Sequence, residues 1–363
     1  MSIPFKILGV DFIELIVNNA RQAVHYYQTQ YGMEPFAFKG LETGEREKVS
    51  YALRQNQIHF VLTAPLTYDS PLNLHLIKHG DGVKDVAFTV DNATKAYEYA
   101  VERGAPSALE PVKIRDTNGS VTMAAIRTYG DTIHTFVERK NYRGEFLPGF
   151  QPYRSPLKTK SVGLLAVDHF VGNQPESQMQ KIVEWYETKL GFHRFWTVDD
   201  KDISTEYTAL RSIVVADESE VIKMPVNRPA AGLKKSQIEE FVEYYSGPGI
   251  QHIALSTKNI VETVSQMSQN GVEFLEVPFS YYEELPDRVG KLEENIEDLA
   301  KLGILVDKDE FGYLLQIFTK PVQDRPTLFY EVIQRRGSKS FGKGNFKALF
   351  ESIEREQARR GNL

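Results

Sequence analysis

Cysteine is absent from the 363 residues of the chain. Its absence excludes disulfide bonds, thiolate metal sites and a cysteine nucleophile. It also fits a reducing compartment, where disulfides are rare. A metal site in this chain would therefore depend on histidine and carboxylate ligands.

Excess positive charge and long apolar runs are lacking as well. The formal net charge is -6 at pH 7, so neither nucleic acid nor an anionic membrane is expected as a partner. No apolar run approaches transmembrane length, and the first residues lack the charged and apolar regions of a signal peptide. The expected location is cytoplasmic. A hydrophobic content of 41% is ordinary for a globular protein, and the length allows two domains.

A pattern of strand followed by helix occurs twice along the chain. Residues 7–15 predict a strand and residues 20–30 a helix, and the pair returns at residues 163–170 and 181–189. Such a repeat predicts a duplicated α+β unit.

A second match between the two halves is closer. Residues 82–88 match residues 249–255, which lie 167 positions later, and the same distance separates Gly104 from Gly271. Between the halves, residues 147–160 are rich in proline and mostly polar, which is typical of a boundary. We therefore predict an N-terminal domain of residues 1–150 and a C-terminal domain of residues 158–363.

Three ligand-type residues stand in apolar, strand-like segments of the second half: His169, His252 and Glu331. Two imidazoles and one carboxylate on one face suit Fe(II), Zn, Mn or Ni and leave coordination positions open. A lone buried histidine is more often a hydrogen-bonded core residue, and a lone strand glutamate usually faces solvent. Here the three occupy successive strands of one repeated unit, which favours a metal site.

The first half lacks this set. Phe12 and Asp85 stand at the positions that match His169 and His252, and Glu138 can be aligned with Glu331. We therefore expect a structural N-terminal domain without metal and a functional C-terminal domain.

Several long motifs of the chain resemble the 4-hydroxyphenylpyruvate dioxygenase family of the vicinal-oxygen-chelate superfamily. They cover the whole chain in order and are densest after residue 160. They are Val-Asp-His-Phe at residues 167–170, Lys-Ser-Gln-Ile at 235–238, Gly-Ile-Gln-His-Ile-Ala-Leu at 249–255, and the segments 314–321, 329–335 and 341–350.

The resemblance implies an α+β fold with tandem βαβββ modules that form two open barrel domains. It also implies one Fe(II) per chain held by His169, His252 and Glu331, with O2 as co-substrate. The implied reaction converts 4-hydroxyphenylpyruvate to homogentisate and CO2 in tyrosine catabolism. Family members assemble as dimers or tetramers, so a homo-oligomer is expected.

The family's pocket residues also carry over to this chain. Phe318 and Phe346 would clamp the substrate ring, a geometry that aromatic pairs favour. Amides that both donate and accept hydrogen bonds suit a phenol and a keto acid. The implied catalytic residues are Ser212, Asn227, Gln237, Gln251 and Gln316, and the implied substrate-binding residues are Phe318, Phe329, Phe341, Asn345 and Phe346.

The tail of the chain predicts an amphipathic helix that starts near Phe346, with Asn345 as its N-cap. In the family this helix closes over the metal, which makes it a lid. Two departures from the family occur nearby. Arg228 replaces the usual glutamate, and residues 338–340 contain less glycine than usual.

Three other readings compete with this one. Hydroxymandelate synthase shares the fold, ligands and substrate but hydroxylates the benzylic carbon. A non-catalytic binding module of the same fold would be expected to lose ligands, as the first half has. An extradiol dioxygenase usually needs further histidines near the metal, and only His193 is left in the second half.

Overall fold

Local sequence signals set the ends of several helices in the computed structural model of the chain. At the start of the first helix, Asn19 accepts a hydrogen bond from the backbone N–H of Gln22, and Gly32 ends that helix in the left-handed region at φ +64°. Such residues satisfy or terminate backbone groups that have no partner inside the helix. The structure describes residues 3–198, 209–230 and 232–362.

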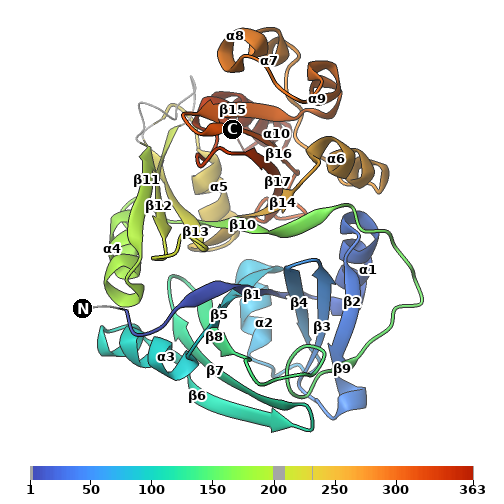
Figure 1. The fold of residues 1–363 in the computed structure, drawn as a ribbon, viewed down its shortest axis with the longest axis vertical. Coiled ribbons are helices and arrows are strands. Elements are labelled where there is room, and N and C mark those ends of the chain that lie inside the picture. The colour runs from blue at the N-terminus through green and yellow to red at the C-terminus, as the bar shows by residue number, and fades with distance from the viewer. Residues whose placement is uncertain (1–2, 199–208, 231, 363) are drawn as a thin grey trace.

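The first half of the chain forms one curved sheet (Figure 1). Its elements are β1 (Ile7–Ile16), α1 (Ala20–Tyr31), β2 (Glu34–Lys39), the 3-10 helix η1 (Leu41–Thr43), β3 (Lys48–Gln55), β4 (Ile58–Pro65), α2 (Leu72–His79), β5 (Gly82–Val90), α3 (Ala93–Glu102), β6 (Ser107–Asp116), β7 (Gly119–Arg127), β8 (Ile133–Glu138) and β9 (Gln151–Pro152). Across the sheet the strands follow the order β6-β7-β8-β5-β1-β4-β3-β2-β9.

The second half forms another curved sheet, stacked on the first (Figure 1). Its elements are β10 (Leu164–Asn173), α4 (Met179–Leu190), β11 (His193–Val198), β12 (Ala209–Ala216), β13 (Lys223–Ala230), α5 (Gln237–Tyr244), β14 (Gly249–Thr257), α6 (Ile260–Gln269), α7 (Ser280–Glu283), α8 (Leu285–Val289), α9 (Ile296–Leu302), β15 (Leu305–Asp309), β16 (Gly312–Phe318), β17 (Phe329–Arg336), the 3-10 helix η2 (Lys343–Asn345) and α10 (Phe346–Arg359). The strand order is β11-β12-β13-β10-β14-β17-β16-β15.

Each sheet consists of two modules in which a strand, a helix and three further strands follow one another. The modules are β1-α1-β2-β3-β4 and β5-α3-β6-β7-β8 in the first sheet, and β10-α4-β11-β12-β13 and β14-α6-β15-β16-β17 in the second. The first strands of the two modules pair antiparallel at the centre of each sheet. The predicted α+β fold of tandem βαβββ modules is confirmed.

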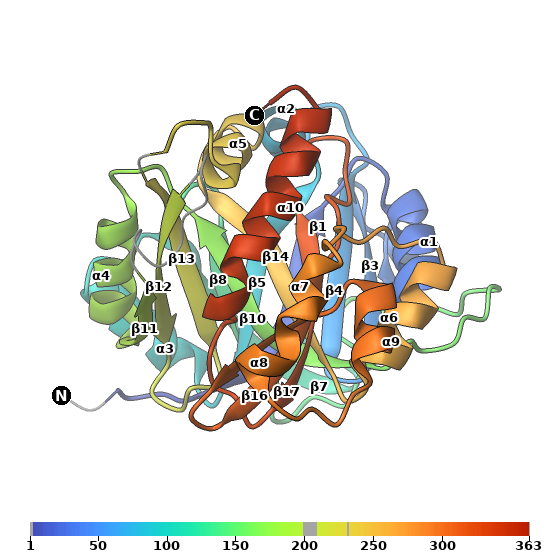
Figure 2. The same cartoon turned by 90° about the horizontal axis from the view of Figure 1, so that it is seen from above.

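The two sheets differ in what packs on their inner faces. In the second sheet α10 crosses the inner face (Figure 2) and packs with α5 on side chains of the strands, among them Phe318 and Phe329. In the first sheet the chain after β8 packs there instead, with Phe146 and Leu147 buried against residues such as Phe12. The last helix of the chain therefore covers the second sheet, where the first sheet has an irregular segment.

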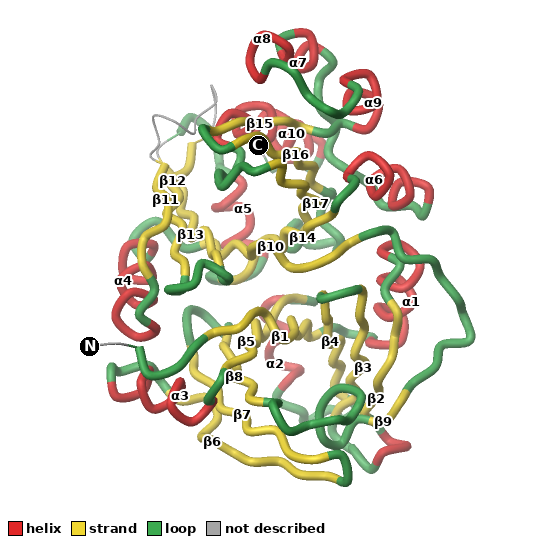
Figure 3. Tube along the Cα trace, viewed as in Figure 1, coloured by secondary structure: helices red, strands yellow, loops and turns green. Residues whose placement is uncertain are grey.

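The stretch that the sequence marks as a boundary is partly built into the first sheet. Leu147 is buried, and β9 pairs with β2. Residues 153–163 then run as an irregular segment along one side of the molecule to β10 (Figure 3). The division into two domains stays a prediction. None of the helices in the described ranges is long and apolar enough to cross a bilayer.

Candidate metal centre and adjoining cavity

Neighbouring strands at the centre of the second sheet carry the predicted metal ligands. His169 lies on β10, His252 on β14 and Glu331 on β17. In the register of the sheet, Ala254 of the middle strand pairs with His169 on one side and with Glu331 on the other. Because alternate residues of a strand share a face, the three ligand side chains project from one face of the sheet.

The ends of these side chains converge. Glu331 Oε2 lies 3.2 Å from His169 Nε2 and 3.5 Å from His252 Nε2. One ligand atom from each residue lies within 4.8 Å of the others. His169 and Glu331 are buried, and the His252 side chain is 12% exposed. Among the described residues, no other group of three His, Asp or Glu side chains meets the same condition.

Charge interactions inside the site oppose the effect of burial. Burial disfavours the charged form of His169, but Glu331 and Asp168 outweigh it and raise the pKa of His169 to about 9. Burial also opposes ionisation of Glu331, yet the imidazoles lower the pKa of its carboxyl. Burial lowers the pKa of His252. The site therefore holds an ionised carboxylate, and a bound metal ion would displace the proton of His169.

The donor atoms fit a divalent metal. Glu331 Oε1 is buried and has no hydrogen-bond partner, a costly arrangement for a carboxylate oxygen unless a cation satisfies it. Two imidazole nitrogens and one carboxylate form the set that suits Fe(II) and similar ions, and they leave further coordination positions for other ligands.

A cavity adjoins the three ligands. The space between its lining atoms is about 540 Å³, open solvent at the mouth included. Eleven of the thirteen predicted site residues line it: His169, Ser212, Asn227, Gln237, Gln251, His252, Phe318, Phe329, Glu331, Phe341 and Phe346.

Five lining residues were not predicted from the sequence: Val171, Leu210, Pro225, Leu349 and Phe350. The alternation of strands could have found three of them. Each of these stands two positions from a predicted strand residue and so shares its face. The two helix residues belong to the apolar stripe of the tail, whose periodicity also indicates the buried face of α10.

Gln316 and Asn345 are the two predicted residues that do not line the cavity. Gln316 is 1% exposed, and its side-chain amide lies beside Gly342. Asn345 is fully buried, and its Oδ1 accepts a hydrogen bond of 2.7 Å from the hydroxyl of Tyr281. Asn345 is the N-cap residue of α10 as expected, but its side chain makes no capping hydrogen bond. Both residues support the segment that leads into α10.

The polar lining residues form two groups. Gln251 donates a hydrogen bond of 3.3 Å to Gln237, and its own side-chain oxygen lies 3.3 Å from His252 Nδ1. Ser212 and Asn227 face each other across β12 and β13, and Asn227 Oδ1 is buried without a partner. An unpartnered amide oxygen in a largely apolar cavity can accept a hydrogen bond from a ligand.

Aromatic side chains enclose the ligand end of the cavity. Phe329 stacks on His252 with ring centroids 4.8 Å apart, and Phe341 meets His169 edge to face at 5.1 Å. Phe318 lies edge to face with His252 at 6.0 Å. These contacts hold the imidazole rings in place and keep the surroundings apolar. Phe346 reaches the same cavity from α10.

Arg228, which replaces the glutamate usual in the family, makes two polar contacts. Its guanidinium donates a hydrogen bond of 2.8 Å to the carbonyl of Pro229 and lies 3.7 Å from the Glu176 carboxylate. The pair with Glu176 is weak, because that carboxylate is mostly exposed.

Thr135, not Glu138, takes the place of Glu331 in the first sheet. Phe88 pairs with Phe136 there, as the corresponding Leu255 and Val332 pair in the second sheet. The residue before Phe136 is Thr135, so the alignment of Glu138 with Glu331 is wrong. The Glu138 carboxylate instead accepts a hydrogen bond from the backbone N–H of Ala93 at the start of α3.

Asp85, at the position of His252, is a buried carboxyl group. Thr135 donates to it twice, from its backbone N–H at 3.0 Å and from its hydroxyl at 2.5 Å. Burial nevertheless raises the pKa of Asp85 to about 8. Between pH 3.8 and about 8, Asp85 is therefore mainly protonated in the folded protein and mainly ionised in the unfolded chain.

Asp85→Asn should stabilise the protein at pH 8 and leave its stability unchanged near pH 4. A raised pKa contributes stability that is present below the unfolded value of 3.8 and is lost as pH rises through the folded value of about 8. The loss is at most about 1.4 kcal/mol for each pH unit. Melting temperatures of both proteins across this range test it. A wild-type stability that rises steadily toward pH 8 relative to Asp85→Asn would contradict the prediction.

Comparison with known proteins gives matches over both halves. The family described as "Hydroxyphenylpyruvate dioxygenase, HPPD, N-terminal" matches residues 1–146, and the "Glyoxalase/Bleomycin resistance protein/Dioxygenase superfamily" matches residues 166–317. The chain is 51% identical to the 4-hydroxyphenylpyruvate dioxygenase of Yarrowia lipolytica, over 98% of this chain and 93% of that protein. It is 52% identical to the protein of the same name from Danio rerio, over 99% of this chain and 93% of that protein.

A solved structure is similar over nearly its full length. It is a mutant of 4-hydroxymandelate synthase from Streptomyces coelicolor, with a TM-score of 0.87 and 30% sequence identity over 97% of this chain and 99% of that chain. The fold is therefore common to enzymes of both names, and the sequence is nearer to the dioxygenases.

Proposed function

Because the chain belongs to the 4-hydroxyphenylpyruvate dioxygenase family, we propose that it converts 4-hydroxyphenylpyruvate and O2 to homogentisate and CO2 in tyrosine catabolism. It is an oxidoreductase of the dioxygenase type. The observation that carries the proposal is the convergence of His169, His252 and Glu331 beside an aromatic-lined cavity, in a chain about half identical to relatives of that name. The hydroxymandelate synthase is less similar, so that alternative is not favoured.

The proposed cofactor is one Fe(II) per chain, held by His169, His252 and Glu331. Bound there, Fe(II) would supply positions at which a 2-oxo acid can chelate and O2 can be activated. Support comes from the donor set and from the buried, unpartnered oxygen of Glu331. The first domain is proposed to be structural, because its matching positions hold Phe12, Asp85 and Thr135.

The side chains of the cavity would bind and orient the substrate. The oxygen and N–H groups of Asn227, Gln237 and Gln251 can hold the polar ends of a keto acid or phenol. Phe318 and Phe346, on opposite elements, would flank its ring. The apolar lining and α10 would keep water from the reacting groups. We also propose a cytoplasmic location and a homo-oligomeric assembly.

Product analysis tests this function. Purified protein supplied with Fe(II), ascorbate, O2 and 4-hydroxyphenylpyruvate should give homogentisate as the main aromatic product on chromatography. Hydroxymandelate as the main product would overturn the choice of enzyme but not the fold or the metal ligands.

Phe346→Leu should loosen the clamp on the ring and raise the share of other products, since reaction geometry is sensitive to shifts of about 1 Å.

A further inference from the structure

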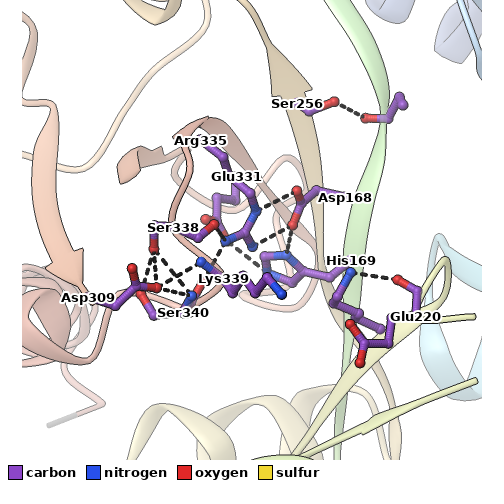
Figure 4. A network of polar contacts seen from close by, with 12 residues as sticks. Asp168, His169, Glu220, Ser256, Asp309, Glu331, Arg335, Ser338, Lys339 and Ser340 are labelled. Atoms are coloured by element: carbon purple, nitrogen blue, oxygen red, sulfur yellow. Dashed lines mark hydrogen bonds and ion pairs between the residues drawn. The ribbon is translucent and has the colours of Figure 1, made fainter. Parts of the chain in front are cut away.

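Asp168 connects the metal ligand His169 to Arg335. Its Oδ1 lies 2.8 Å from His169 Nδ1, the ring nitrogen that faces away from Glu331. Both carboxylate oxygens also accept hydrogen bonds from Arg335, at 2.8 Å each (Figure 4). Neither Asp168 nor Arg335 lines the cavity. The pair therefore contacts the ligand from behind and is placed to orient it.

A bulge in β10 brings Asp168 and His169 to the same side. Val167 pairs with Leu255 and His169 with the preceding residue of β14, so that Asp168 is the extra residue between them. Successive side chains of a regular strand point to opposite faces. An extra residue in a bulge re-aims its side chain, and such bulges are common next to active sites.

The first sheet contains the same pair without a metal ligand. Asp11 is the extra residue of a bulge in β1 and precedes Phe12, the counterpart of His169. Its carboxylate accepts hydrogen bonds from Nε of Arg139 at 2.8 Å and from a terminal nitrogen of the same guanidinium. An aspartate–arginine pair at this place is therefore part of the duplicated fold, and the phenylalanine beside it cannot donate a hydrogen bond.

The two aspartate–arginine pairs differ in the third group that contacts the aspartate. In the first sheet the hydroxyl of Thr89 donates a hydrogen bond of 2.7 Å to Asp11. The corresponding Ser256 donates instead to the backbone carbonyl of Ala166, at 3.2 Å (Figure 4). The hydroxyl of Thr89 contacts the carboxylate oxygen that also accepts from Nε of the arginine, whereas His169 lies beside the oxygen that accepts from the terminal nitrogen. The contact with an imidazole is thus specific to the second sheet.

Arg335 also holds the segment that leads to α10. One of its terminal nitrogens donates to the carbonyls of Ser338 and Ser340, at 3.2 Å and 2.6 Å. The Asp309 carboxylate accepts hydrogen bonds from the same segment, including the backbone N–H of Ser340 at 2.9 Å (Figure 4). The next residue is Phe341, whose ring meets the ring of His169.

We propose that Asp168, held by Arg335, is a positioning residue for His169 and couples that ligand to the segment 338–341. The carboxylate keeps the proton on Nδ1, so that Nε2 presents its lone pair to the metal. The guanidinium fixes the carboxylate and the segment at once. Second partners of this kind orient metal-bound imidazoles generally. The inference rests on the metal centre proposed above.

Asp168→Asn and its matched control Asp11→Asn test the inference, with Co(II) as the probe. The substitution of Asp168 would place an amide N–H against the guanidinium or the imidazole. We expect Asp168→Asn to weaken Co(II) binding about 10- to 100-fold, to alter the visible Co(II) spectrum, and to speed proteolysis after residue 337. Asp11→Asn breaks the equivalent pair, so it should lower the melting temperature without changing Co(II) affinity or spectrum.

The outcomes separate this inference from the proposed function. Wild-type binding of Co(II) with unchanged affinity and spectrum in folded Asp168→Asn overturns the positioning role alone. A wild-type protein that binds no Co(II) overturns the metal centre and the positioning role together. If Asp168→Asn does not fold, Arg335→Lys takes its place. That variant keeps the charge but loses the fork that grips both oxygens, and unchanged Co(II) affinity in it again overturns the role.

Discussion

Alanine in place of Glu331 is expected to abolish turnover and metal binding while the fold persists. The carboxylate is the one anionic member of the site, and its Oε2 lies 3.2 Å and 3.5 Å from the two imidazoles. Without it, two neutral nitrogen donors remain, a much weaker site for Fe(II). His169→Ala and His252→Ala should act alike. Iron analysis, turnover and circular dichroism measure the three effects, and full activity in any one variant would contradict the assignment of its ligand.

Glu138→Ala supplies the control for this experiment. Its carboxylate stands on the corresponding strand of the first sheet but contacts the start of α3. This variant should keep wild-type turnover and metal content. Wild-type protein should contain about one iron per chain, as one complete set of ligands requires. A second equivalent that disappears in Asp85→Ala would show that the first domain also binds metal.

The features that the sequence predicts best are those that follow from a regular spacing of residues along the chain. The strand expected at residues 7–15 is Ile7–Ile16, and the helix expected at 20–30 is Ala20–Tyr31. The repeat predicted the modules of both sheets, and the ligand set followed from apolar strands that each contain one ligand-type residue. Such features depend on nearby residues, so one sequence suffices to find them.

Features set by distant contacts were missed. The strand of residues 135–139 contains a glutamate that can be aligned with Glu331, but the register of the sheet places Thr135 there. Asn345 has the residue type of an N-cap, but Tyr281, far away in the sequence, binds its side chain. Arg335 could have been found from its repeat partner Arg139, since each stands four residues after the matched strand position and pairs with the aspartate of the first strand.

The same architecture explains why one half holds the site and the other does not. On the first sheet Phe12 replaces a histidine and packs edge to face against Phe146, with ring centroids 5.6 Å apart. On the second sheet the matching contact is made by His169 and Phe341, and α10 covers a cavity. A phenylalanine at the ligand position thus closes the first sheet with an apolar core. On the second sheet a histidine at that position places a ligand-type nitrogen beside the cavity.

Gly342→Ala is expected to lower turnover about 100-fold while metal binding is retained. Gly342 has φ +77°, and a Cβ there would lie 2.7 Å from Oε1 and 2.8 Å from Cδ of Gln316. Gln316 is buried, so its side chain has little room to withdraw. The backbone must shift instead, and it carries Phe341 on one side and Phe346 on the other. Displacement of cavity residues by about 1 Å can reduce a rate by about two orders of magnitude.

Gly44→Ala separates the effect of the clash from that of the backbone angle. Gly44 also lies in the left-handed region, at φ +88°, but a Cβ there would meet no atom within 4 Å. Both variants carry the cost of alanine in the left-handed region, about 1 kcal/mol. Only Gly342→Ala should lose turnover and show faster proteolysis of the tail, with unchanged iron content. Equal turnover in the two variants would mean that the close contact between Gly342 and Gln316 does not control the shape of the cavity.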